Sequence, residues 1–166
     1  VKGFMCLDVG ASSGGFTDCL LQAGARHVYA VDVGYGQLDW RLRKDSRVTV
    51  LERTNIRYVT RDMLPDDFDL ITIDVSFISL KIVVPAVQPF LKPGGSILAL
   101  VKPQFEVGRG QVGKGGVVKD AHLHEQVVQE LTEFLEANKL SARGHCPSPI
   151  LGPKGNKEFL LYLARL

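Results

Sequence analysis

Four charged residues lie where apolar stretches of the chain begin or end, at positions that core packing does not require. Asp74 ends one apolar run and Lys102 ends another, Glu158 opens the last run, and Lys2 lies just before the first. Amine and carboxylate groups that meet at a ligand site can hold or move protons, and such groups gather at functional sites. A single charged residue at a strand end is often merely solvated. Together the four point to a site of acid–base chemistry.

A glycine-containing loop follows the first apolar run, with the sequence DVGASSGGFT from Asp8 to Thr17. Glycines allow a sharp turn and let a ligand approach the main chain, and the helix expected next offers free N–H groups. Asp32 ends the second apolar run, where an acid can accept hydrogen bonds from both hydroxyls of a ribose. This order favours a bound nucleoside over a turn without a ligand.

Three ligand classes compete for this loop. A phosphate-binding P-loop requires a Gly-Lys-Ser/Thr ending, and Gly14-Gly15-Phe16 lacks it. The GxGxxG pattern of dinucleotide sites is also absent from the loop. S-adenosylmethionine carries no phosphate and tolerates a more varied loop with an acid at its start. A literal GxGxxG occurs at Gly108, Gly110 and Gly113, but it precedes Lys114-Gly115-Gly116 and no helix, so we reject it as a nucleotide site.

Strand-like and helix-like stretches alternate along the whole chain. We expect strands at 4–9, 27–33, 48–51, 68–75, 96–101, 142–146 and 158–163, and helices at 16–25, 37–44, 80–91 and 120–138. We expect a turn at 93–95 and a long mobile loop at 103–118. This alternation predicts an α/β fold with a mainly parallel, doubly wound sheet and helices on both faces. Ligands of such folds bind beyond the carboxyl ends of the strands.

The composition is that of one soluble globular domain. The chain has 166 residues, 45% hydrophobic, and a formal charge of +2, which neither requires nor excludes a nucleic-acid partner. Three cysteines without a CxxC pair suit a reducing, cytoplasmic location. No apolar run is long enough to span a membrane. His122 and His124 are two residues apart and read as surface residues, so we expect no metal site.

The motifs in their order resemble the FtsJ-type RNA 2′-O-methyltransferases, and most of all the TlyA (haemolysin A-like) rRNA methyltransferases. The resemblance spans almost the whole chain and is carried by LDVGASSGGFTD, AVDVGYGQ, ERTNIR, IDVSFISL, LVKPQFEVG and GNKEFLLYL. It implies a Rossmann-like class I S-adenosylmethionine-dependent methyltransferase domain over residues 1–166. It also implies ribosomal RNA or ribosomal subunits as partner, with a ribose hydroxyl as acceptor, and neither DNA nor a membrane. Such proteins usually carry an upstream S4 RNA-binding domain. Without one, we expect weak RNA affinity and low activity.

The resemblance also implies roles for individual residues. It assigns a Lys-Asp-Lys-Glu tetrad to Lys2, Asp74, Lys102 and Glu158. Lys102 would help to remove the hydroxyl proton, Lys2 would add positive charge, and the two acids would orient the lysines. Cofactor contacts are expected from Asp8, Gly10, Ser12, Gly14, Gly15, Phe16, Thr17, Asp32, Asn55 and Asp74.

Several alternatives remain open at this point. One is methylation of a small molecule or a protein, although the Asn/Asp-Pro-Pro-Tyr segment of many amine methyltransferases is absent after Asp74. A membrane-active haemolysin and a cofactor-binding module without catalysis are the others. Trp40 and Phe77 are expected in the core or lining the cofactor pocket, with stacking on a base as the alternative. Basic residues fall into two groups: a solvated face (Arg41, Arg43, Lys44, Arg47) and candidate RNA-phosphate contacts (Lys102, Arg109, Lys114, Lys119).

Overall fold

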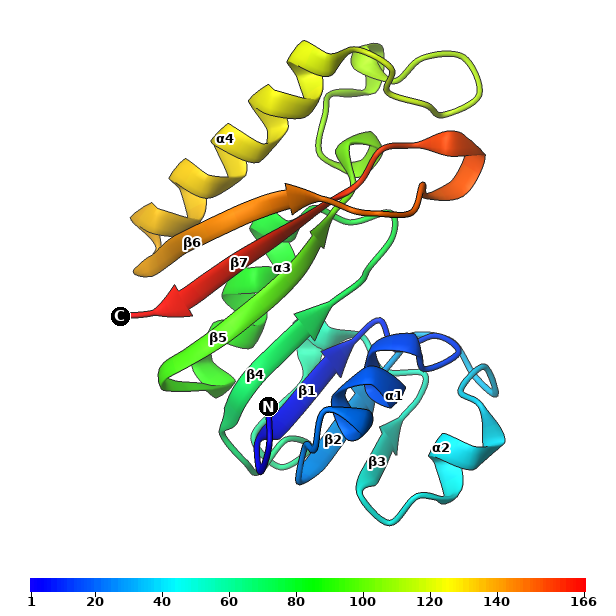
Figure 1. Ribbon diagram of the computed structural model, residues 1–166, viewed down its shortest axis with the longest axis vertical. Coiled ribbons are helices and arrows are strands. Elements are labelled where there is room, and N and C mark those ends of the chain that lie inside the picture. The colour runs from blue at the N-terminus through cyan, green and yellow to red at the C-terminus, as the bar shows by residue number, and fades with distance from the viewer.

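Seven strands form one sheet in the order β3-β2-β1-β4-β5-β7-β6 in the computed structural model (Figure 1). The structure describes residues 1–166 apart from the side chain of Arg109, so the RNA contact expected from that residue lies outside the described part. The strands are β1 (Met5–Val9), β2 (His27–Val31), β3 (Val48–Leu51), β4 (Phe68–Ile73), β5 (Leu91–Val101), β6 (Leu140–Pro147) and β7 (Phe159–Arg165).

The first five strands are parallel, and β7 pairs antiparallel with both β5 and β6. The carboxyl ends of β1 to β5 therefore share one edge of the sheet. Because β7 runs the other way, its first residue, Phe159, pairs with Val101, the last residue of β5. The beginning of β7 thus reaches the same edge as the ends of the parallel strands.

Helices cover both faces of the sheet, as the alternation predicted. They are α1 (Gly15–Gln22), α2 (Trp40–Lys44), α3 (Leu80–Val87) and α4 (Ala121–Ala137). Two buried clusters lie on opposite faces of β1, one with Cys6 beneath α1 and α2 and the other with Leu7 beneath α3 and α4. This confirms a doubly wound, mainly parallel α/β fold.

Side-chain caps explain where three of the helices begin. The side chains of Asp39, Ser79 and Asp120 accept hydrogen bonds from backbone N–H groups in the first turns of α2, α3 and α4. The apolar stripe predicted for α4 is buried at Val127, Val128, Leu131 and Leu135, and Phe134 is partly buried. Short 3-10 helices lie at Ile56–Tyr58, Gln88–Phe90, Pro103–Phe105, Arg109–Gln111 and Pro153–Gly155.

Pro93–Gly95 does not separate a helix from the fifth strand as expected, since β5 already begins at Leu91. Leu91 pairs with Phe68, and the next pair joins Ser96 to Leu70, so the register shifts between them. A bulge absorbs the extra residues, and the positive φ of Gly94 (74°) serves this bulge. Pro93–Gly95 has residue types that favour a turn, as predicted, but these residues lie inside β5.

Two side chains, those of His124 and Trp40, differ from expectation in their exposure. His124 is buried, with a ring nitrogen 2.7 Å from the carbonyl oxygen of Val118, so its reading as a surface residue is wrong. Trp40 is 61% exposed and lies neither in the core nor at the cavity beyond the ends of the strands, whereas Phe77 is 89% exposed and lines that cavity, which was one of the two expected positions. The segment ending at Val118 packs over the first turn of α4 and covers His124. The spacing of residues within α4 could not predict this contact.

None of the described helices combines the length and the apolar character needed to cross a membrane.

Candidate active site

A cavity of about 510 Å³ opens at the carboxyl ends of β1, β2 and β4. Five of the residues predicted to contact the cofactor line it: Gly10, Ser12, Asp32, Asn55 and Asp74. Apolar side chains complete the wall, among them Val31, Ile56, Val75 and Ile78. The volume is in the range of small-molecule sites, and a mainly apolar wall with few polar groups is typical of them.

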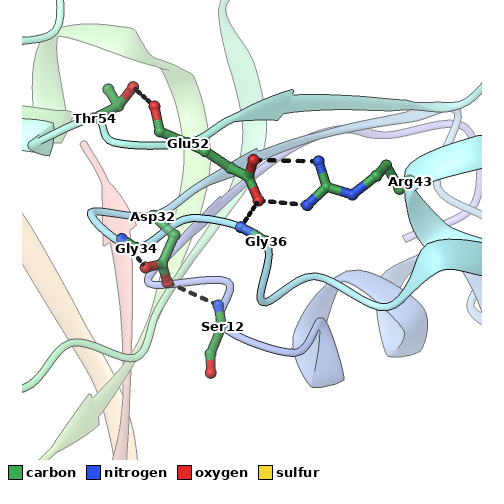
Figure 2. A network of polar contacts seen from close by, with 7 residues as sticks. All are labelled: Ser12, Asp32, Gly34, Gly36, Arg43, Glu52 and Thr54. Atoms are coloured by element: carbon green, nitrogen blue, oxygen red, sulfur yellow. Dashed lines mark hydrogen bonds and ion pairs between the residues drawn. The ribbon is translucent and has the colours of Figure 1, made fainter.

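The Asp32 carboxylate is held by two main-chain N–H groups (Figure 2). Its Oδ2 accepts a hydrogen bond from the Ser12 N–H at 2.8 Å, and its Oδ1 accepts one from the Gly34 N–H at 2.7 Å. An ionised carboxylate has about four acceptor positions, so this one can still accept hydrogen bonds from a ligand.

Glu52, which the sequence reading did not single out, fixes the neighbouring loop (Figure 2). Its carboxylate accepts a hydrogen bond from the Gly36 N–H at 2.9 Å and forms an ion pair with Arg43. Arg43 therefore has a specific partner, although it lies on the exposed face that we expected. Asn55 begins the 3-10 helix Ile56–Tyr58, with its Oδ1 accepting from the Arg57 N–H at 3.0 Å.

Gly10 brings two strand ends into direct backbone contact. Its φ is +80°, and a Cβ at this position would lie 2.0 Å from the carbonyl oxygen of Asp74. The loop after β1 thus lies against the chain that leaves β4, with no room for a side chain. Gly15 and Phe16 line a second cavity of about 360 Å³ together with Asp74.

Three predicted cofactor contacts, Asp8, Gly14 and Thr17, do not line these cavities. Asp8 and Thr17 are fully buried. The Asp8 carboxylate accepts hydrogen bonds from the hydroxyls of Thr17 (2.7 Å) and Thr72 (2.9 Å), and burial raises the pKa of Asp8 to about 6. A Cβ on Gly14 would collide with Leu42. Asp8 points beneath the loop because the side chains of a strand alternate between its two faces. Thr17 hydrogen-bonds to it there from α1, and Gly14 lies against Leu42.

Asp74 and Lys102 meet beside the cavity, as predicted. The Nζ of Lys102 lies 2.6 Å from Oδ1 of Asp74 and donates a hydrogen bond to Oγ of Ser76 at 3.2 Å. The Lys102 side chain is 11% exposed and that of Asp74 is 35% exposed. β4 and β5 are neighbouring parallel strands, so residues that follow them converge at one edge.

Glu158 reaches the same site at the start of β7 and is buried. The amide Nε2 of Gln104 donates a hydrogen bond to its Oε1 at 3.4 Å. Burial raises the pKa of Glu158, while the positive charge of Lys102 acts in the opposite direction. Gly152 makes room for the carboxylate, since a Cβ there would lie 2.0 Å from the Glu158 Oε1.

Lys2 is not brought to this cluster. It packs against Gly24, and the neighbouring Gly3 N–H donates a hydrogen bond to the Gly24 carbonyl oxygen at 2.8 Å. This is the amino edge of the sheet, separated from the cavity by the length of β1, about 17 Å for five residues. The tetrad expected from the resemblance is therefore a group of three in this structure, because Lys2 precedes a strand whose far end carries the site.

Glu106 and Phe105 couple the two loops that carry Asp74 and Lys102. The Glu106 carboxylate accepts hydrogen bonds from the Ser79 hydroxyl (2.6 Å) and the Leu80 N–H (2.8 Å), and burial raises its pKa. Phe77 has a positive φ of 64° and lies with its ring centroid 4.8 Å from that of Phe105. No local spacing links Ser79 to Glu106, so only the fold reveals this connection. Among the described residues, no cluster of His, Cys, Asp or Glu side chains is placed to hold a metal ion.

The sheet order and the cavity at its carboxyl edge define the Rossmann-like class I methyltransferase fold. The N-methyltransferase NodS from Bradyrhizobium japonicum shares this fold, with a TM-score of 0.68 at 18% identity over 99% of this chain and 87% of that chain. The sequence profile described as FtsJ-like methyltransferase matches residues 1–165. The chain belongs to the FtsJ-like methyltransferase family.

Closer relatives fall within the TlyA group that the motifs indicated. The 16S/23S rRNA (cytidine-2′-O)-methyltransferase TlyA of Mycobacterium tuberculosis is 50% identical over 98% of this chain and 61% of its own length. A solved Streptococcus thermophilus structure, provisionally assigned as a hemolysin, has a TM-score of 0.96 at 47% identity, over 99% of this chain and 60% of that chain. The chain thus spans about three fifths of the length of these relatives.

Proposed function

We propose that this chain is the catalytic domain of an enzyme that methylates the 2′-hydroxyl of a ribose in ribosomal RNA with S-adenosylmethionine. The observation that carries the proposal is the Lys102–Asp74 pair, 2.6 Å apart at the edge of a nucleoside-sized cavity. The M. tuberculosis relative, named as an rRNA (cytidine-2′-O)-methyltransferase, supports the choice of acceptor. With ribosomal RNA as substrate, the proposed place of action is the cytoplasm.

The residues around the cavity fit S-adenosylmethionine. The Asp32 carboxylate would accept hydrogen bonds from the ribose hydroxyls of the cofactor, and the apolar wall near Ile56 would hold its adenine, with Asn55 at the edge. Gly10 leaves the main chain open to close approach. When bound, the cofactor supplies a methyl group on a positively charged sulfur, which is the electrophile of the reaction.

Lys102, Asp74 and Glu158 would act on the acceptor. A ribose hydroxyl is a weak nucleophile until its proton is removed or shared. In the structure Lys102 forms an ion pair with Asp74, and this pair holds the lysine nitrogen at a fixed place beside the cavity. There it would bind the hydroxyl and take its proton, while the two carboxylates orient it. Fixing the nucleophile in line with the methyl group would supply much of the acceleration.

The surface around the cavity mouth suits RNA better than a small molecule. Phe77 is exposed at the rim, where it can stack on a nucleobase. Tyr35 is exposed in the loop after β2, with the Arg53 guanidinium 4.3 Å from its ring centroid. Paired aromatic and cationic groups are suited to unstacked bases and phosphates. Lys114 and Lys119, which we expected to contact phosphates, are exposed.

Transfer of labelled methyl groups tests the proposal. The chain is incubated with labelled S-adenosylmethionine and with intact ribosomal subunits, free RNA, protein or small molecules. We expect label only on RNA, at ribose oxygens, as found by nuclease digestion and mass spectrometry. Label on base nitrogens, on protein or on small molecules would contradict the proposed acceptor.

A further inference from the structure

Two segments that leave neighbouring strands are joined by a series of contacts at the site. One is the segment 74–80, from the end of β4 to the first residue of α3, and the other contains the 3-10 helix Pro103–Phe105. Nearest the strands, the Lys102 ammonium group lies 2.6 Å from the Asp74 carboxylate and donates a hydrogen bond to the Ser76 hydroxyl at 3.2 Å. The contacts therefore begin at the pair that we propose to act on the acceptor.

Farther along both segments, the contacts continue in the same order. The rings of Phe77 and Phe105 lie with their centroids 4.8 Å apart. Next after them, the Glu106 carboxylate accepts hydrogen bonds from the Ser79 hydroxyl at 2.6 Å and from the Leu80 N–H at 2.8 Å. Glu106 thus makes the last contact, at the N-terminus of α3, where N–H groups lack helical partners and favour a negative charge.

The first of these segments has a strained backbone. Phe77 has a φ of +64°, which side chains disfavour, and its ring is exposed. Such a conformation persists only where the surroundings fix it, and strained residues gather at functional sites. Before Phe77, Ser76 is bonded to the Lys102 ammonium group, and after it Ser79 is bonded to Glu106. Without the second bond, the strain could relax by a movement of the whole segment.

We propose that Glu106 is a positioning residue, which keeps Lys102 and Asp74 in contact at the methyl-transfer site by fixing the segment 74–80. This inference rests on the proposed function. Glu106 is itself held close to Lys102 by a tight turn. The Phe105 N–H donates to the Lys102 carbonyl oxygen at 2.9 Å. The Glu106 N–H donates to the Pro103 carbonyl oxygen at 3.0 Å. Its carboxylate is thus fixed relative to the lysine and bonded to the segment that begins with the aspartate.

Three variants separate this role from a general effect on stability. Glu106→Ala removes both hydrogen bonds. In Glu106→Gln, the amide oxygen can accept from the Leu80 N–H and the amide N–H can donate to the Ser79 hydroxyl, so both contacts are kept without the charge. Asp120→Ala is the matched control, because Asp120 caps α4 through the His122 N–H at 2.9 Å and lies outside the site. It measures the effect of losing a helix cap alone.

The reactivity of the Lys102 amine tests the proposal without any need for turnover. The Lys102 side chain is 11% exposed in its ion pair with Asp74, so an acylating reagent should modify it slowly. Limited acetylation, measured for each lysine by mass spectrometry, should be several times faster at Lys102 in Glu106→Ala. In Glu106→Gln and Asp120→Ala it should be as slow as in wild type. The exposed Lys44 serves as the internal reference.

Methyl transfer at saturating cofactor supplies the second readout. We expect kcat of Glu106→Ala to fall by about 10- to 100-fold, since a displacement of about 1 Å at a reacting group can cost about 100-fold. Glu106→Gln should retain most of the wild-type kcat, and Asp120→Ala should match wild type. Ser79→Ala, which removes one of the two hydrogen bonds from the other side, should show smaller changes of the same sign. It replaces Glu106→Ala if that variant does not fold.

An unchanged Lys102 reactivity or an unchanged kcat in folded Glu106→Ala would overturn the proposal. An equal loss of kcat in Glu106→Gln would also overturn it, because the effect would then come from the charge. So would an equal loss in Asp120→Ala, which would point to stability alone. If wild type transfers no methyl group to RNA, the proposed function fails, and the acetylation experiment still decides whether Glu106 keeps Lys102 in place.

Discussion

The Lys102 ammonium group lies among oxygen atoms of different burial and charge. Asp74 and Ser76 contact it directly, and the buried Glu158 acts on it from the start of β7. These groups come from the ends of β4 and β7, the strands on either side of β5, which carries Lys102. They fix the position of the nitrogen at the end of the long lysine side chain. Such fixation is what a proton-transferring group at a reacting oxygen requires.

Replacing Lys102 by alanine should abolish methyl transfer and leave cofactor binding largely intact. We expect kcat to fall by about 100- to 10,000-fold, since the group proposed to take the proton is lost. Transfer of labelled methyl groups and calorimetric titration with S-adenosylmethionine measure the two properties separately. Lys44→Ala, which removes an exposed lysine from the face expected to be solvated, is the control. Wild-type turnover by Lys102→Ala would remove this residue from the mechanism.

Asp8 should make the protein less stable as the pH rises. Its pKa is raised by burial from 3.8 to about 6, so between these values the folded state binds more protons than the unfolded state. The free energy of unfolding therefore falls as the pH rises from about 4 to about 6, by about 3 kcal/mol for a shift of this size. Urea unfolding of wild type and Asp8→Asn across this range should show a steeper decline in wild type, because Glu106 and Glu158, whose pKa values burial also raises, contribute to the decline in both proteins. Parallel curves for the two proteins would contradict the assignment.

At the scale of single residues, the sequence predicted the convergence of three of the four charged residues and misplaced the fourth, Lys2. Asp74, Lys102 and Glu158 do converge, since each lies at a strand end that faces the same edge. Lys2 also lies beside a strand, but at its beginning, and adjacency in sequence does not distinguish the two edges. Gln104 and Glu106 carried no signal of their own, because their partners come from distant parts of the chain.

At the scale of elements, the loop after β1 and the chain leaving β4 are in contact through Gly10. This contact gives the cavity its floor, since the two loops leave neighbouring parallel strands and turn over the same edge. The sequence located all seven strands and four helices within a few residues, because each has a clear apolar pattern. It missed the bulge in β5, where local turn chemistry is accommodated by strand pairing.

Gly10→Ala should destabilise the fold and weaken cofactor binding. The new methyl group would meet the Asp74 carbonyl oxygen in a backbone conformation that side chains disfavour, and we expect a loss of about 3–5 kcal/mol. Gly36→Ala is a matched control, because Gly36 has a similar φ of 69° with open space around it. That variant should lose only about 1–2 kcal/mol. Chemical unfolding of both proteins makes the comparison, and equal losses would show that backbone strain alone matters.

At the scale of the molecule, the glycine-rich segment between β5 and α4 is fastened to the turn that precedes β7. The buried Asn156 accepts a hydrogen bond from the Val118 N–H at 3.1 Å and donates to the Gly116 carbonyl oxygen at 3.0 Å. Lys154 donates to the Gly115 carbonyl oxygen at 2.9 Å. The sequence predicted a long mobile loop here. In the structure this segment is instead hydrogen-bonded to Asn156, which lies two residues before Glu158.

Asn156→Ala should release this segment. The Val118 N–H and the Gly116 carbonyl would lose their partner, and we expect a loss of about 2 kcal/mol in stability. Hydrogen exchange measured by mass spectrometry should rise in peptides covering residues 113–119 and stay constant in α4 beyond its first turn. Asn138→Ala, which removes a side-chain bond at the far end of α4, should leave residues 113–119 unchanged. Unaltered exchange in Asn156→Ala would show that other contacts hold the segment.

The place of β7 between β5 and β6 constrains the order in which the sheet is completed. β6 is synthesised first, yet its sheet neighbour is β7, with Leu140 opposite Arg165 and Pro147 opposite Phe159. While the ribosome has yet to release β7, β6 has no strand to pair with and β5 presents an open edge. The insertion that closes the sheet is also the event that delivers Glu158 to Lys102. Catalytic competence should consequently appear in a single late step of biogenesis, and nascent chains halted before Phe159 should bind the cofactor without transferring its methyl group.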